Sequence, residues 1–247
     1  MGNKVIGKVG PKLGIYEESN DDQLSASLGQ ERVMDDGRKF RLCSNGEAAL
    51  AAGFRLQSVA VDTYDDALVV NAVAAVGDKE IEVTTTSSHS GHAANLLKDG
   101  YLVVNQGTGC IGTFYKIKAN DLMSTGVTAT IELYDALTYA IAIDDEVSIC
   151  LNPYKGVILD VLTAPIAGVP LIAVTASTST VTYYFWALFK GFGPAIVANG
   201  QTATSGFPVE RLTGGEVKTL ATGATIIPIG NSYSVGAADD AIICEYF

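Results

Sequence analysis

Alternation of apolar and polar residues between positions 79 and 134 constrains the fold of this chain more than any other feature of its sequence. In KEIEVTTT, Ile81 and Val83 alternate with charged or hydroxyl-bearing neighbours, and VTATIELY repeats the pattern with Ile131 and Leu133. Successive side chains of a β-strand point to opposite faces, so a period of two predicts strands with one buried and one solvated face. These segments therefore predict sheets of the antiparallel kind.

The composition agrees with a mainly β protein. The 247 residues are 48% hydrophobic and 17% charged, which argues against disorder. The helix-compatible segment EAALAAG lies between two glycines and is shorter than the ~12 residues that an independent helix needs. We therefore predict antiparallel sandwich- or barrel-like β domains with short helices and an extended N-terminal arm.

Changes of pattern along the chain predict three segments. Residues 1–60 hold a polar arm at 16–37 and a first β segment, and residues 61–190 form a central β domain. Residues 191–247 show short apolar runs at roughly eight- to twelve-residue spacing with Gly-rich turns, the pattern of a small β-barrel-like segment. The pairs Asp36-Gly37 and Gly214-Gly215 predict hairpin turns.

Charge and cysteine content bear on the compartment and on partners. The formal charge of −11, with lysines scattered along the chain, argues against a nucleic-acid partner. No stretch approaches the ~20 apolar residues of a membrane span, and the first residues lack the apolar core of a signal peptide. The four cysteines form no CxxC pair, so we expect buried free thiols and assembly in the cytoplasm.

The run VTYYFWALFK is apolar on both faces, unlike the alternating segments. A strand of this kind is either enclosed in a core or covers a neighbouring subunit, and we expect a part of each. The predicted interface residues are Tyr183, Tyr184, Phe185, Trp186, Leu188 and Phe189. The alternative, a sugar-binding aromatic platform, is disfavoured because consecutive strand residues face opposite ways.

A G-x-G-x-x-G pattern occurs at Gly107, Gly109 and Gly112. A dinucleotide site needs a helix to begin there, so that its N-terminal amides meet the pyrophosphate. Here TFYKIK follows, which predicts a second strand and hence a hairpin or bulge. We therefore predict no cofactor.

His89 and His92 are the only histidines, and several pairs of acidic residues could suggest calcium or glycosidase chemistry. The histidines fall in a Ser/Gly-rich segment with no carboxylate close in sequence, so we expect a solvated loop. A metal or anion shared around a symmetry axis is the alternative. The acidic pairs are expected to be solvated turn carboxylates, and no metal ligand or catalytic residue is predicted; these pairs are Asp21-Asp22, Asp65-Asp66, Asp144-Asp145-Glu146 and Asp239-Asp240.

The segment DDGRKFRLCSNGEAALAAG resembles one in tailed-phage proteins encoded near the major capsid gene. The order that follows is also similar: the block VTTTSSHSGHAANLLKDGYLVVNQGTGCIGTFYKIKAN, then GVPLIAVTA, YYFWALFKGFGPAIV and the ending PIGNSYSVGAADDAIICEYF. The resemblance covers most of residues 30–247 and implies a capsid decoration (cement) protein on the exterior of the virion head. It implies the major capsid protein as partner, a homo-oligomer with a trimer favoured, and no enzymatic site. A tail or fibre component that binds a receptor is the structural alternative, and a hydrolase is a further one.

Overall fold

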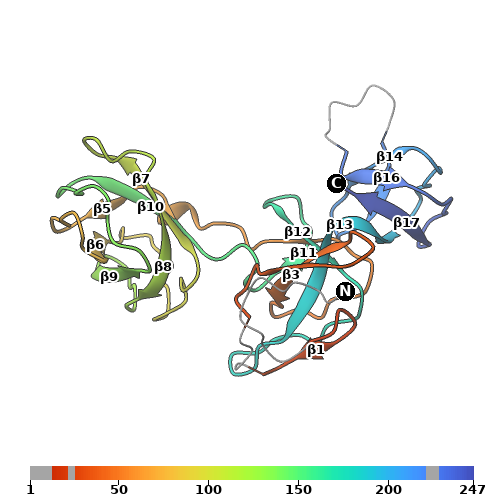
Figure 1. Cartoon of the computed structure of the whole chain (residues 1–247), viewed down its shortest axis with the longest axis horizontal. Helices are drawn as coiled ribbons and strands as arrows, with labels where there is room; N and C mark the ends of the chain where they lie inside the picture. Colours follow the sequence, from red (N-terminus) through yellow and green to blue (C-terminus); the bar gives the residue numbers. More distant parts are fainter. Residues whose placement is uncertain (1–12, 22–25, 221–227) are drawn as a thin grey trace. The chain divides into compact units, whose positions relative to one another are not determined.

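The computed structural model describes residues 13–21, 26–220 and 228–247, and it is nearly all β (Figure 1). Strands hold 41% of the chain and helices 1%, and the sheets are antiparallel. The predicted fold class, with sandwich- or barrel-like β domains, is therefore confirmed. None of the helices among the described residues has the length and apolar character that crossing a membrane requires.

Residues 61–152 form one compact unit, a closed six-stranded barrel in the order β10-β5-β6-β9-β8-β7. The alternating segments of the sequence supply its walls: Ile81 and Val83 of β6 and Ile131 and Leu133 of β9 are fully buried in its core. Closure leaves no unpaired sheet edge. The strands are β5 Leu68–Val70, β6 Glu80–Thr84, β7 Tyr101–Gln106, β8 Phe114–Asn120, β9 Thr128–Leu133 and β10 Glu146–Cys150.

Residues 1–60 and 153–247 form the other unit, an eleven-stranded sheet arranged around the 13-residue strand β13, Tyr184–Ile196. β13 is buried on both faces in its first half: Phe185 belongs to one hydrophobic cluster and Trp186 to another. The remaining strands are β1 Glu18–Ser19, β2 Glu31–Val33, β3 Lys39–Ser44, β4 Leu56–Gln57, β11 Ile158–Leu159, β12 Ile166–Pro170, β14 Pro208–Arg211, β15 Val217–Thr219, β16 Gly230–Ser232 and β17 Ala241–Tyr246.

The division of the chain differs from the three predicted segments. The boundary near residue 61 is found, but the barrel ends at Asn152, and residues 153–190 join the first and last segments. The reason is β13, which runs across the predicted boundary at 190/191 and pairs with β1, β3, β12 and β17. Residues on both sides of that boundary therefore belong to one continuous strand of the same sheet.

The predicted N-terminal arm is likewise corrected. β1 pairs with β13, and β2 forms a hairpin with β3 through the turn at Asp36-Gly37. Residues 22–25 of the arm lie outside the described residues. The polar character of this segment reflects short strands with one solvated face, which a sequence rich in Asp, Glu and Ser does not distinguish from an extended arm.

Five turns of the same construction introduce strands in both units. In each, the carbonyl of the first residue accepts the N–H of the fourth at 3.1–3.3 Å, and the third residue has a φ between 63° and 98°. The residue before each turn forms an isolated β-bridge. The turns are 75–78, 124–127, 142–145, 204–207 and 237–240, and they lead into β6, β9, β10, β14 and β17.

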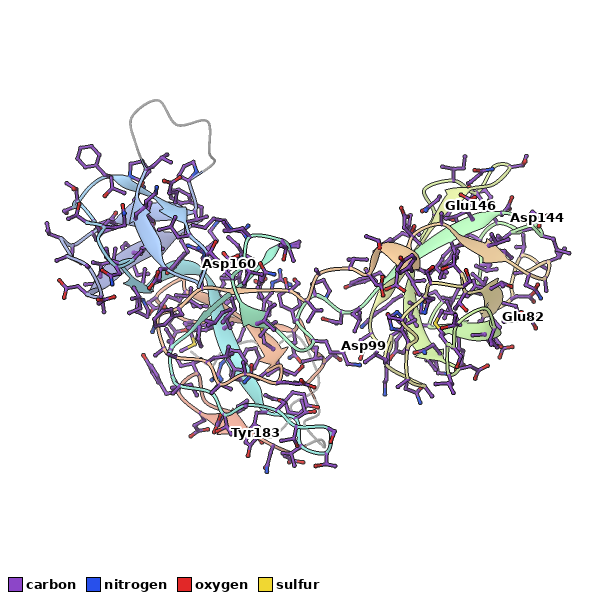
Figure 2. The ribbon with its side chains drawn as sticks, turned by 180° about the vertical axis from the view of Figure 1, so that it is seen from behind. Glu82, Asp99, Asp144, Glu146, Asp160 and Tyr183 are labelled. Atoms are coloured by element: carbon purple, nitrogen blue, oxygen red, sulfur yellow. The ribbon has the colours of Figure 1, made fainter. Side chains whose placement is uncertain are left out.

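Three of these turns end in aspartate, and their carboxylates act locally. Asp78, Asp145 and Asp240 each accept the N–H of the first turn residue at 2.7–2.9 Å. Such Asp side chains stabilise turns by replacing a backbone acceptor. Asp144-Asp145 and Asp239-Asp240 therefore lie in turns, as predicted, whereas Glu146 is the first residue of β10; Asp144 and Glu146 are labelled in Figure 2.

Candidate functional site

His89 and His92 do not lie in a solvated loop, and the prediction that they do is wrong. Both side chains are buried, with 2% and 6% of their residue surface exposed. His92 forms a β-bridge with Met123, the residue that precedes one of the five turns, and the hydroxyl of Thr125 in that turn donates to the carbonyl of His89 at 3.0 Å. Ordinary backbone pairing thus holds the histidine segment against the barrel.

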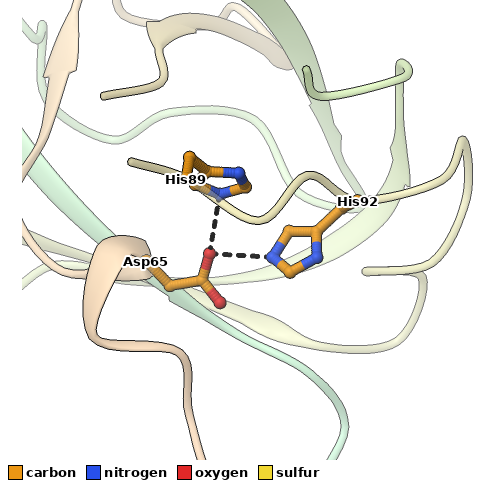
Figure 3. Close-up of side chains that lie close together, drawn as sticks. All are labelled: Asp65, His89 and His92. Atoms are coloured by element: carbon orange, nitrogen blue, oxygen red, sulfur yellow. Dashed lines mark hydrogen bonds and ion pairs between the residues drawn. The ribbon is translucent and has the colours of Figure 1, made fainter. Parts of the chain in front are cut away.

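Asp65 completes the cluster (Figure 3). It ends the 3-10 turn η1, Thr63–Asp65, at the start of the barrel unit, and its side chain is fully buried. The Asp65 Oδ1 atom lies 3.1 Å from Nε2 of His89 and 2.8 Å from Nε2 of His92. The expectation that Asp65 is a solvated turn carboxylate is therefore wrong, whereas its neighbour Asp66 is exposed.

The hydrogen bonds fix the tautomer of His89. Its Nδ1 atom accepts the backbone N–H of Gly91 at 2.8 Å, so the ring proton resides on Nε2 and is donated to Asp65. Nδ1 of His89 has no lone pair left for a second proton.

The three side chains present ligand atoms that all lie within 4.8 Å of one another, the one such group among the described residues. A metal ion needs the free lone pair of a neutral imidazole, and a metal-bound histidine normally donates its other ring N–H to an acceptor. His89 does the reverse, because its Nδ1 accepts from Gly91. Nε2 of His89 is therefore a donor, and the donor set does not fit a three-ligand metal centre.

A second layer of contacts secures the cluster. Asp62, the N-cap of η1, accepts the N–H of Tyr64 at 3.0 Å and the hydroxyl of Ser90, which lies between the two histidines. The Ser90 hydroxyl, followed by the Tyr64 amide, lowers the pKa of Asp62 below its usual value. Asp62 and Asp65 together join η1 to the histidine segment.

One atom of the cluster stays unpaired: Oδ2 of Asp65 is buried and has no hydrogen-bond partner. Catalysis by a His–Asp pair needs a reacting group within reach of the outer ring nitrogen. No described hydroxyl or thiol bonds to Nδ1 of His92. As arranged, the cluster joins two backbone segments and presents no assembled nucleophile–base pair.

The predicted interface residues divide into two groups. Phe185, Trp186 and Leu188 are buried in the chain's own core, so for these three the interface prediction is wrong. Trp186 also donates its indole N–H to the carbonyl of Leu13 at 3.0 Å. Tyr183, Tyr184 and Phe189 are half-buried, and an interface role for them stays a prediction; Tyr183 is labelled in Figure 2.

The glycine-rich motif is a hairpin, as predicted. Gly107, Gly109 and Gly112 lie in the connection between β7 and β8, which pair antiparallel. Gly109 and Gly112 have φ values of 81° and 79°, a conformation that favours glycine. No helix follows the motif, so it offers no row of free amides to a pyrophosphate.

The cysteines are free thiols, as predicted, and three of the four are buried.

Comparison with known proteins adds no relative. No protein-family model, curated protein or solved structure matches the chain.

Sequence reasoning missed Asp65 as the partner of the histidines. The signals were present, namely the chain's only two histidines three residues apart and an aspartate in a short turn, but 24 and 27 residues separate Asp65 from them. It also missed two buried charged residues, Arg55 and Asp160, which bond to each other across 105 residues.

Proposed function

We propose that this protein is a non-catalytic structural protein that acts by binding, specifically a capsid decoration protein on the head of a tailed phage. One observation carries the non-catalytic part. The described cluster in which titratable side chains converge, Asp65 with His89 and His92, holds two backbone segments together through its own hydrogen bonds. Its chemistry supports the fold of the barrel.

Exposed apolar side chains on the barrel support a binding role. Val73, Val76, Tyr139 and Ile143, here called the bridge patch, are between 52% and 64% exposed. The bridge between Ala74 and Ile141 pairs the two segments that carry these four side chains. Large exposed apolar side chains on paired segments are typical of surfaces that bind another protein.

The virion role rests on the sequence resemblance, and particle location tests it. Purified protein is mixed with expanded heads of the phage that encodes it, and heads are imaged and heated with and without it. A decoration protein covers the head surface and raises the temperature at which heads rupture, because a ligand of the assembled shell stabilises that shell. Absence of binding and of stabilisation contradicts the proposal, and labelling confined to the tail favours the tail or fibre alternative.

The bridge patch gives a sharper test of the contact surface. Val76→Asp places a charge in the patch, and we expect it to weaken head binding or oligomer formation. Val235→Asp is the matched control, because Val235 is 76% exposed and belongs to the other unit. Equal behaviour of the two variants would remove the patch from the proposed interface.

Oligomeric state is measured independently by solution mass under native conditions. A trimer has three times the 25.8 kDa mass of the chain. The hydrolase alternative is addressed by a broad activity screen with a His89→Ala/His92→Ala variant. An activity that the double substitution abolishes while the fold persists would overturn the non-catalytic assignment.

A further inference from the structure

Arg55 is the most deeply buried arginine or lysine among the described residues, with 1% of its surface exposed. It directly precedes β4, and its backbone is fixed on both sides. Its N–H donates to the carbonyl of Gly215 at 2.7 Å, and its carbonyl accepts the N–H of Asp160 at 3.0 Å. These bonds fix the point at which the side chain leaves the backbone, and the side chain itself is buried.

One carboxylate serves two arginines at this point. Asp160, fully buried and labelled in Figure 2, accepts Nε of Arg55 at 3.0 Å and two donors of Arg211, at 3.0 Å and 2.6 Å. The N–H of Leu162 also donates to it at 2.9 Å. Both carboxylate oxygens are thus satisfied, and the three ionised groups together carry one excess positive charge.

The far side of the Arg55 guanidinium is unpaired. Nε and Nη2 face Asp160, and Nη2 also approaches the carbonyl of Leu212 at 3.4 Å. Nη1 is buried and has no hydrogen-bond partner. A buried donor without an acceptor destabilises a fold, and a buried charge does so more strongly. An acceptor that reached Nη1 would remove that penalty.

Arg55 lines a pocket of about 230 Å³. Apart from Arg55, its walls are mainly apolar. The hydroxyl of Tyr246, another lining residue, already donates to the carbonyl of Pro194 at 2.8 Å. Drug-sized ligands occupy sites of roughly 300–1,000 Å³, so an occupant of this pocket is smaller. Its apolar walls include Ile166, Val169, Leu188 and Ile229.

We propose that this pocket binds a small organic monoanion, a carboxylate with a hydrocarbon body, through the guanidinium of Arg55, which lines the pocket and whose Nη1 has no partner within the chain. The single excess charge matches one carboxylate, and a doubly charged phosphate would leave a charge unpaired in an apolar setting. The apolar walls favour a hydrocarbon chain over an inorganic ion. Charge-assisted hydrogen bonds of this kind are the strong ones.

Calorimetry on the full chain tests the proposal with hexanoate as probe and hexanamide as its uncharged analogue. We expect saturable one-to-one binding of hexanoate, about tenfold or more tighter than that of hexanamide. The reason is that hexanoate offers the arginine a charged acceptor, whereas hexanamide offers a neutral one. No saturable binding of hexanoate, or equal binding of the two probes, overturns the proposal. The proposal is also overturned if chloride or phosphate competes for the site as strongly as hexanoate binds to it.

Variants separate the charge from the pocket. Arg55→Met removes the donors but leaves Asp160 paired with Arg211, and Ile229→Trp fills the pocket but keeps the charge. Each is expected to weaken hexanoate binding about tenfold or more, whereas Arg38→Met, at a surface ion pair with Asp36, leaves it unchanged. If Arg55→Met does not fold, Ile229→Trp alone decides, and undiminished binding in that variant contradicts the proposal.

Discussion

Nε2 of His92 lies 2.8 Å from Oδ1 of Asp65, and the two residues are 27 positions apart in the chain. This contact, with its counterpart from His89, fastens the first turn of the barrel unit to the segment that follows β6. It converts what sequence alone presents as a polar loop into a buried hydrogen-bonded cluster. Whether that cluster stabilises the barrel is directly measurable.

Asp65→Ala leaves the Nε2–H groups of two buried histidines without an acceptor. We expect the variant to lower the free energy of unfolding of the barrel by about 3 kcal/mol, since breaking one side of a buried charged network has costs of this order. Peptide-resolved hydrogen exchange measures the loss unit by unit. Asp135→Ala, an exposed aspartate of the same unit, is the control; a similar loss in both variants would contradict a specific role for the cluster.

Added zinc is expected to leave the melting temperature of the protein unchanged. The Nδ1 atom of His89 accepts the N–H of Gly91, so Nε2 carries a proton and is not a ligand. Thermal unfolding with and without zinc, and after treatment with a chelator, measures this. A rise in melting temperature that disappears in His92→Ala would show that the cluster rearranges around a metal.

Acid is expected to weaken the barrel through Asp62. Its pKa is held below the ordinary value of 3.8 by the Ser90 hydroxyl and then the Tyr64 amide. A carboxyl whose pKa is lower in the folded state stabilises fully above that ordinary value, and the contribution is lost as pH falls through the folded pKa. Hydrogen exchange of barrel peptides, measured as pH is lowered below 3.8, follows this loss of stability. Asp62→Asn should make the stability of the barrel less dependent on pH in that range.

Asp36→Asn is the matched control for the acid experiment. The pKa of Asp36 is also lowered, first by the backbone N–H of Arg38, but Asp36 belongs to the other unit. This substitution should alter acid sensitivity only in the peptides of its own unit. Flattening of the barrel response by Asp36→Asn would show that the response does not arise from Asp62.

Gly214 and Gly215 form a matched pair in the turn between β14 and β15. Both have positive φ, 92° and 81°, but a Cβ on Gly214 meets nothing within 4 Å, whereas one on Gly215 lies 2.4 Å from the carbonyl oxygen of Arg55. Gly214→Ala should lower the unfolding free energy by about 1–2 kcal/mol, the cost of a left-handed alanine. Gly215→Ala should lower it more, because backbone must shift. Urea unfolding measures both, and equal losses would contradict the close approach.

The four thiols should differ in reactivity. Burial raises the pKa of Cys244 to about 12 and raises that of Cys43 further, so both stay protonated at neutral pH. Cys150 is only half-buried, although burial raises its pKa too. In native protein, iodoacetamide should therefore label Cys150 before Cys43 and Cys244, as mass spectrometry of peptides can show. In denaturant all four should react alike; native labelling of Cys43 at the rate of Cys150 would contradict this order.

Local patterns predicted most of the secondary structure. Period-two alternation placed the buried residues of β6 and β9, because a strand's geometry fixes which side chains share a face. Glycine pairs and Asp-Gly predicted hairpin turns, because few other residues adopt positive φ without strain. The five similar turns have no clear sequence signature. Each requires a particular backbone angle at one position, and only three of them also use an aspartate.

The sequence by itself determined the mainly β class and the doubly apolar character of β13, since each depends on residues close together in the chain. Only the tertiary structure decided that β13 draws residues 153–190 away from the barrel, that Asp65 meets His89 and His92, and that Arg55 shares Asp160 with Arg211. These contacts join positions from 24 to 105 residues apart. Closing such loops is compensated by the packing of whole sheets, so no local pattern of residues specifies which distant groups will meet.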